Sequence, residues 1–262
     1  MESGSDVRRI WWCLTGPLSF LPIHAAGIYP DGRKLSNFAV SSYTPTLNTL
    51  LDKPHTQPEQ PAQHQLLVVA LPYESQLPGT AKEVERVVKH AESFRVLTLI
   101  ESEATVQHIS EAMKSSSWVH FACHGAQNTT NPSDSCLLLA SHSKLTLSNI
   151  IKLQLENAEL AFLSACQTAT GDEELQDEAV HLAAGMLLAG YRSVIATMWS
   201  IDDDIAVEVA DEAYRCLFTE YRADPRRAAE ALHFAVKTVR QSREARGKVS
   251  LFSWVPFIHM GI

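Results

Sequence analysis

The stretch Trp118-Val-His-Phe-Ala-Cys-His-Gly125 decides the fold, because a short and largely apolar run stops there at a histidine and a glycine. Apolar runs of this length are typical of strands that are buried on both faces of a parallel sheet. A second stretch, Leu160-Ala-Phe-Leu-Ser-Ala-Cys-Gln-Thr168, has the same form and stops at a cysteine. The two stretches predict neighbouring central strands, one followed by a histidine and the other by a cysteine.

Outside these stretches, strand-like runs alternate with amphipathic segments. Strands are predicted at residues 66–70, 95–100, 118–123, 160–165 and 193–198, and helices at 81–91, 105–114, 178–189, 203–221 and 225–243, with a short helix from Ser148. The spacing of Thr80 and Glu83 predicts a capping box at the first helix, and Gly190 predicts a left-handed cap at the end of the helix before it. This alternation indicates an α/β fold with a mostly parallel sheet and helices on both faces.

The length of 262 residues and the 45% hydrophobic content suit one large globular domain. The segment 52–65 carries Pro54, Pro58 and Pro61 without periodicity and is predicted to be an exposed linker. We therefore expect a single domain over residues 1–262, with an N-terminal subregion (1–51), the linker and a catalytic α/β body (66–262). The sequence leaves open whether the domain stands alone or was excised from a longer protein.

The net charge of −8 argues against a nucleic-acid binder. Basic residues gather between Arg215 and Lys248, where a solvated helical face is favoured over a polyanion site. The five cysteines form no disulfide framework, which predicts reduced thiols and a cytoplasmic protein. The apolar run of residues 10–23 is broken by prolines and polar residues, so no membrane association is expected.

The histidine and cysteine that follow the two central strands predict a catalytic pair. Parallel neighbouring strands end at one edge of a sheet, where ligands bind in α/β folds. His124 is expected to act as the base that activates the Cys166 thiol, since a free thiol is mostly protonated at neutral pH. The N–H groups of Gly125 and Cys166 are the expected oxyanion donors.

Other interpretations of these residues were weighed. A cysteine at a strand end is often a small buried hydrophobe, and a lone histidine is often structural. Cys123, His124, Cys136 and Cys166 could count as four zinc ligands, but adjacent ligands chelate poorly and no Cys-x-x-Cys pair exists. The segment from Leu77 lacks the spacing of a phosphate-binding loop. No metal and no cofactor are expected.

Five ordered motifs give the chain a resemblance to a known family, the CHAT domain. The motifs are Val119-His-Phe-Ala-Cys-His-Gly125, Leu163-Ser-Ala-Cys-Gln-Thr168, Asp177-Glu178, Ala189-Gly-Tyr-Arg-Ser-Val194 and Ala196-Thr-Met-Trp-Ser-Ile-Asp202. The segments 15–26 and 254–259 resemble the opening and the end of that domain, so the resemblance covers nearly the whole chain. The family is caspase-like, is related to separase and is often attached to tetratricopeptide repeats.

The resemblance implies a three-layer α/β/α sandwich and a cysteine endopeptidase with the dyad His124 and Cys166. It implies oxyanion donors at Gly125 and Cys166, a protein or peptide substrate, and tetratricopeptide-type or other regulatory domains as partners in a longer chain. From the likeness to separase it also implies a carboxylate that selects a basic P1 residue, with Asp203 as first choice and Asp202 as second. Capping of the following helix is an equal alternative for these aspartates.

Two rival functions stay open at this point. One is a non-catalytic, caspase-like interaction or signalling module, and the other is a cysteine-dependent acyl hydrolase or transferase that acts on a non-peptide substrate. Four further features are assigned structural roles: helix capping for Asp177-Glu178, packing for His181 and Trp199, and a structural position for His120 on the strand face opposite Phe121.

Overall fold

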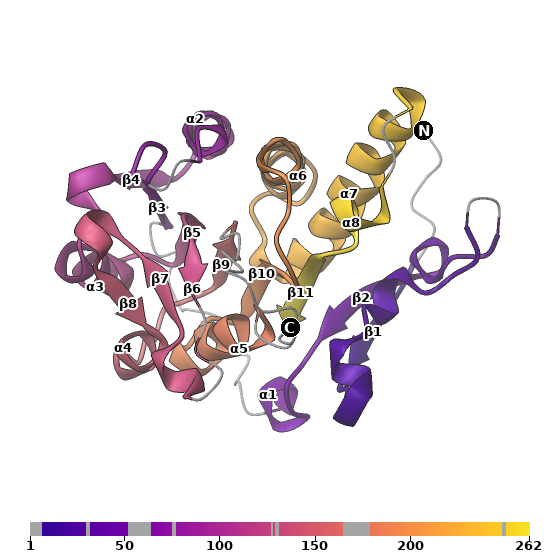
Figure 1. Cartoon of the computed structure of the whole chain (residues 1–262), viewed down its shortest axis with the longest axis horizontal. Helices are drawn as coiled ribbons and strands as arrows, with labels where there is room; N and C mark the ends of the chain where they lie inside the picture. The colour runs from indigo at the N-terminus through magenta and orange to yellow at the C-terminus, as the bar shows by residue number, and fades with distance from the viewer. Residues whose placement is uncertain are drawn as a thin grey trace.

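One eight-stranded sheet forms the centre of the chain (Figure 1). The computed structural model describes residues 7–29, 32–51, 64–74, 77–126, 128, 131–164, 179–247 and 250–262. The strand order is β1-β2-β11-β10-β9-β5-β3-β4. The strands are β1 Arg8–Trp12, β2 Ala39–Tyr43, β3 Gln65–Ala70, β4 Arg95–Ile100, β5 Trp118–Ala122, β9 Leu160–Leu163, β10 Ser193–Thr197 and β11 Phe257–Gly261.

The sheet is mostly parallel, as predicted. Every described strand pair in it is parallel except β10 with β11. The five predicted strands correspond to β3, β4, β5, β9 and β10, with ends that shift by one or two residues. Strands β1, β2 and β11 were not predicted, and they place the N-terminal subregion at one side of the same sheet.

Helices cover both faces of the sheet and complete a three-layer α/β/α sandwich (Figure 1). One face carries α2 (Gly79–His90), α6 (Asp203–Arg215) and α7 (Ala228–Ala245), and the other carries α3 (Val106–Ser115), α4 (Leu147–Lys152) and α5 (Ala179–Ala189). The helices α1 (Asn48–Leu51) and α8 (Leu251–Trp254) are short. The predicted helix over 203–221 is in fact α6 followed by a π-helical segment, Cys216–Glu220.

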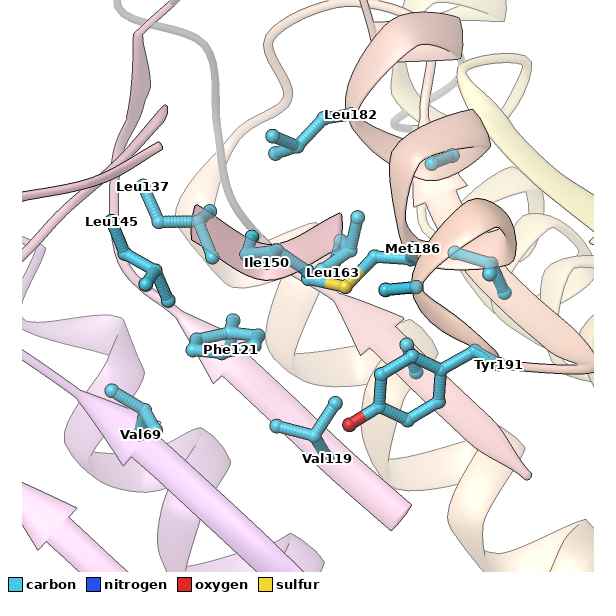
Figure 2. Close-up of a cluster of buried hydrophobic side chains, with 14 of the residues drawn as sticks. Val69, Val119, Phe121, Leu137, Leu145, Ile150, Leu163, Leu182, Met186 and Tyr191 are labelled. Atoms are coloured by element: carbon cyan, nitrogen blue, oxygen red, sulfur yellow. The ribbon is translucent and has the colours of Figure 1, made fainter. Parts of the chain in front are cut away.

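Alternation along the strands supplies a separate core to each face. In β5, Val119 and Phe121 belong to the core under α4 and α5, whereas Trp118 and Ala122 belong to the core under α2 and α6. Figure 2 shows the first of these cores, with Phe121 close to Leu163 of β9 and Met186 of α5 on the same side of the strands. Burial on both faces explains why these strands are almost continuously apolar.

The predicted capping box at the start of α2 was wrong. The helix begins at Gly79, and the Thr80 hydroxyl donates instead to the Leu77 carbonyl at 2.8 Å. Glu83 does not reach back to the helix start, because its side chain is buried against the sheet. By contrast, Thr105 caps α3 as predicted, accepting a hydrogen bond from the His108 N–H at 3.2 Å.

The stop of α5 before Gly190 was predicted correctly, and Gly190 caps the helix. Its φ is +126°, and the N–H groups of Gly190 and Tyr191 donate to the carbonyls of Leu187 and Met186 at 3.2 and 3.1 Å, which is the Schellman pattern. A Cβ at this position would lie 2.1 Å from the Leu155 carbonyl oxygen, so only glycine fits.

A small second sheet lies beside the ends of the central strands. It consists of β6 (Gly125–Ala126), β7 (Cys136–Leu138) and β8 (Lys144–Thr146). Residues 52–63 of the predicted linker lie outside the described residues, and Gln65 already belongs to β3. None of the helices in the described part of the chain has the length and apolar character needed to cross a bilayer.

Candidate active site

The candidate site lies at the edge where β3, β5, β9 and β10 end. These four strands are parallel neighbours, so their carboxyl ends share one edge of the sheet. This is the edge at which α/β folds bind their ligands. His124 follows β5, and the chain that leads to Cys166 leaves β9 here.

The backbone of His124 is held between the central and the small sheet. Its carbonyl oxygen accepts a hydrogen bond from the Leu138 N–H at 2.8 Å, and Gly125 pairs with Leu137 across β6 and β7. The His124 residue is half-buried and Gly125 is buried. The antiparallel pairing of β6 with β7 therefore fixes the backbone of His124 at the edge of the central sheet.

Cys166 lies outside the described residues, so the His124–Cys166 pair stays a prediction. The last described residue before it is Ser164, whose N–H donates to the Phe121 carbonyl at 2.9 Å. Ser164 is thus joined to the strand that leads to His124.

Asp203 lies at this edge too, as the first residue of α6 after β10. One of its carboxylate oxygens, Oδ2, accepts a hydrogen bond from the Gly79 N–H at 3.0 Å. Gly79 begins α2, so this carboxylate occupies the N-terminal end of a second helix, where the helix dipole favours negative charge. Asp203 is half-buried, which leaves part of the carboxylate open to solvent.

Asp202 is the N-cap of α6, but within the described residues its side chain makes no capping hydrogen bond. Its backbone carbonyl accepts from the N–H groups of Ile205 and Ala206 at 2.9 and 3.1 Å, and its side chain is exposed. Capping therefore involves both aspartates, but at different helices. The Asp202 carbonyl accepts the first hydrogen bonds of α6, and the Asp203 side chain accepts a hydrogen bond at the N-terminal end of α2.

Two residues to which we gave structural roles are indeed packed. His120 is fully buried on the face opposite Phe121, with its Nε2 3.1 Å from Glu83 Oε1. Trp199 packs against the core between the sheet and the helices α3, α4 and α5, and it meets the Phe252 ring edge-on. The His181 side chain, Asp177 and Glu178 lie outside the residues that the structure describes.

The two described cysteines near the site are Cys123 and Cys136. Both are buried, and burial raises the pKa of Cys136. Within the described ranges, which exclude Cys166, no group of three residues could hold a metal ion.

The sequence does not predict that Gly79 contacts Asp203 or that Glu83 contacts His120 on β5. The residues Leu77 to Lys82 lack the spacing of a phosphate loop, and the spacing of Glu83 predicts only a capping box. One signal was present in the sequence, because Glu83 lies at helical spacing with the apolar residues Val84 and Val87. A carboxylate on the buried face of a helix needs a partner.

The architecture is that of the caspase-like proteins. A chain titled "Structure of Protease" aligns with a TM-score of 0.62 and 11% identity over 92% of this chain and 57% of that chain. The RgpB pro- and mature domain complex of Porphyromonas gingivalis gives 0.56 and 14%, over 85% and 55%. The separase–securin complex of Saccharomyces cerevisiae gives 0.53 and 14%, over 87% and 14%.

The particular family follows from the sequence. The CHAT domain family model matches residues 2–262, and the chain belongs to that family. No curated protein matches the sequence. The chain spans little more than half the length of the RgpB chain and a seventh of the separase chain. At these identities the structural likeness concerns the fold.

Proposed function

We propose that this CHAT domain is a cysteine endopeptidase in which His124 is the base and Cys166 the nucleophile. The observation that carries the proposal is the hydrogen bond from the Ser164 N–H to the Phe121 carbonyl at 2.9 Å. It joins the end of β9 to β5, so the residues that follow both strands start from adjacent points on one edge. A nucleophile and its base need this kind of placement.

The proposed reaction has two stages. In the first, Cys166 Sγ forms a bond to the scissile carbonyl carbon while His124 takes the thiol proton, and the tetrahedral intermediate then expels the amine, which receives that proton. In the second, a water molecule loses a proton to His124 and attacks the thioester, which releases the acid and restores the thiol. The N–H groups of Gly125 and Cys166 donate to the oxyanion in both stages.

The proposed specificity is for a basic P1 residue, read by Asp203 with Asp202 in second place. Asp203 accepts one hydrogen bond from Gly79 and is half-buried, so its carboxylate keeps acceptor sites for a guanidinium or an ammonium group. Its fixed position and partial burial favour it over the exposed Asp202, since a desolvated carboxylate discriminates charge more strongly.

We further propose that the domain acts within a larger regulated protein, on a protein or peptide substrate. Two of the similar structures are titled as complexes, one of the RgpB pro- and mature domains and one of separase with securin. Tetratricopeptide-type or other regulatory domains are the proposed partners for this chain.

A labelling experiment tests the dyad directly. The wild-type protein is incubated with a peptidyl-Arg acyloxymethyl ketone and digested, and the modified cysteine is located by mass spectrometry. We expect the label on Cys166, and its loss in Cys166→Ala and in His124→Ala. Cys13→Ser is the matched control, because Cys13 is the exposed thiol among the described cysteines and its loss should leave labelling unchanged.

Two outcomes would contradict the proposal. Labelling that persists in His124→Ala at the wild-type rate would show that His124 does not activate the thiol. Absence of labelling by basic, apolar and acidic P1 probes alike would favour the interaction module over the peptidase.

A further inference from the structure

A second cavity lies away from the candidate active site, between the sheet and the C-terminal helices. It is bounded by β2, β11, α7 and α8, and it contains about 610 Å³ of empty space including its mouth. Figure 1 shows these elements together on the side of the molecule opposite β3 and β4. The lining residues are His24, Ser36, Asn37, Ala39, Ser41, Tyr43, Ala229, Leu232, His233, Val236, Lys237, Arg240, Trp254, Phe257, Ile258 and His259.

The cavity is lined by positively charged side chains, whereas the chain as a whole has a net negative charge. Lys237 and Arg240 line it, and none of the described lining residues is an aspartate or a glutamate. The chain as a whole has 30 acidic and 22 basic residues, so its composition does not predict a cavity that is lined by basic residues without acidic ones. Ala229, His233, Val236 and Arg240 recur at helical spacing, which puts them on one face of α7.

Two buried donors at the cavity have no hydrogen-bond acceptor within the described part of the chain. They are the indole N–H of Trp254, a residue only 4% exposed, and the Nε–H of Arg240. The Arg240 side chain is 10% exposed and its guanidinium lies 5.1 Å from the Trp254 ring centroid. Glu244 Oε1 is 3.7 Å from Arg240 Nε, too long for a hydrogen bond. Buried donors normally find an acceptor, so these two indicate a ligand that accepts hydrogen bonds, and the nearby cations favour an anionic one.

The three histidines of the lining fall into two groups. His24 and His259 are already engaged: His24 donates from Nε2 to the Val255 carbonyl at 2.8 Å, and His259 contacts the hydroxyls of Ser42 and Ser193. His233 differs, because burial and the nearby Lys237 and Arg240 lower its pKa to about 4. A negative ligand would relieve that repulsion and raise the pKa of His233.

Six of the remaining lining residues are apolar. Ala39, Ala229, Leu232, Val236, Phe257 and Ile258 supply hydrocarbon surface next to the cationic groups. Small-molecule sites are commonly lined in this way, mostly by apolar groups with a few polar groups that fix orientation.

We propose that this cavity binds a small organic anion, a carboxylate or phosphate headgroup on an apolar body. The headgroup pairs with Lys237 and Arg240 and accepts from the Trp254 indole, while the body lies against Leu232, Val236 and Ile258. This site is independent of the proposed peptidase chemistry, since it shares no residue with His124, Cys166 or Asp203.

Isothermal titration calorimetry on the whole chain tests the site, with hexanoate and phenyl phosphate as probes and hexan-1-ol as the uncharged control. We expect one site with a dissociation constant of about 1 mM or tighter for at least one anion, and much weaker binding of the alcohol. The two anions distinguish carboxylate from phosphate recognition. Saturation should also raise the His233 pKa, followed by NMR of the imidazole protons.

Three variants of lining residues and one control variant make the result specific. Lys237→Gln should weaken anion binding by about 5- to 10-fold, whereas Lys114→Gln on α3, an equally exposed lysine far along the chain, should change nothing. Ala229→Met fills the cavity without altering its charge and should abolish binding. Arg240→Gln also removes the contact with Trp254, so it is interpreted only if its unfolding midpoint stays near that of the wild type.

The proposal is overturned if neither anion binds wild type at about 10 mM. It is equally overturned if hexan-1-ol binds as tightly as hexanoate, or if Lys237→Gln and Ala229→Met both bind like the wild type.

Discussion

Asp203 on α6 and Gly79 on α2, far apart in sequence, are joined by a hydrogen bond of 3.0 Å from the glycine N–H to the aspartate Oδ2. Their approach is so close that a Cβ on Gly79 would lie 2.8 Å from the same oxygen. The contact ties the N-terminal ends of two helices on one face of the sheet and sets the position of the carboxylate. Any role of Asp203 in substrate selection therefore depends on α2.

Asp203→Asn should lower kcat/KM for a peptide with Arg at P1 by about 10- to 100-fold, because a charge-assisted hydrogen bond is worth about 1.5–3 kcal/mol. The same variant should leave a P1 Gln peptide almost unchanged, since no charge pair is lost there. Asp202→Asn is the matched control and should have a smaller effect, as its side chain is exposed. Equal losses for both peptides in Asp203→Asn would assign the residue to structure alone.

Cys166→Ala should remove peptidase activity while the thermal unfolding midpoint stays close to that of the wild type. His124→Ala should reduce kcat by at least about 100-fold, because it removes the general base. Steady-state kinetics with a fluorogenic peptide and circular dichroism measure the two effects. Wild-type turnover in Cys166→Ala would refute the nucleophile.

Removing only one side chain of the buried pair Glu83 and His120 should lower the free energy of unfolding. Glu83 Oε1 lies 3.1 Å from His120 Nε2, and both side chains are at most 2% exposed. Glu83→Ala leaves a buried imidazole without its partner and should lower the free energy of unfolding by about 3 kcal/mol.

The double variant Glu83→Met with His120→Phe removes both polar groups and should recover most of that loss. Urea denaturation of the wild type, Glu83→Met, His120→Phe and the double variant measures the coupling free energy. Simple additivity of the two single effects would mean that the pair does not interact energetically.

Gly190→Ala should destabilise the chain by roughly 2–4 kcal/mol, because the new methyl group would meet the Leu155 carbonyl oxygen at 2.1 Å. Gly247→Ala is a control with positive φ, +70°, but with nothing within 4 Å of its Cβ position. It should cost only about 1 kcal/mol of backbone strain. Chemical denaturation measures both losses. If the two variants lose similar free energies of unfolding, the positive φ of Gly190 matters more than its close approach to Leu155.

Acid should destabilise the domain through its buried histidines. Burial lowers the pKa of His24 to about 4, against a value near 6.5 in the unfolded chain. The unfolded state therefore binds more protons between these values, and stability falls as the pH drops from about 6.5 towards 4. His24 alone should contribute a loss of about 2 kcal/mol between pH 6.5 and pH 5.

Urea denaturation across this pH range measures the effect, and His24→Gln should flatten the profile. His259 contributes in the same direction, because burial and Arg9 lower its pKa well below the usual value. Stability that does not change between pH 6.5 and pH 5 in the wild type would contradict this account.

The central strands were predictable because each carries its own signal. The apolar runs of β3, β5, β9 and β10 follow from burial on both faces, which dictates composition residue by residue. Among the strands that were not predicted, β2 carries no such signal. β2 contains Ser41 and Ser42, and these hydroxyls are satisfied by Trp12 and His259 from neighbouring strands. A polar strand of this kind becomes recognisable only once its partners are in place.

The amino-acid sequence by itself determined the α/β class, the five predicted strands and the residue types at their ends, since these depend on local periodicity and apolar runs. Only the tertiary structure decided the strand order, the Asp203–Gly79 contact, the Glu83–His120 pair and the basic cavity. Each of these joins residues that are far apart along the chain, and such contacts depend on how whole elements pack. A pattern in one segment fixes which face is buried, but not which distant residue meets it there.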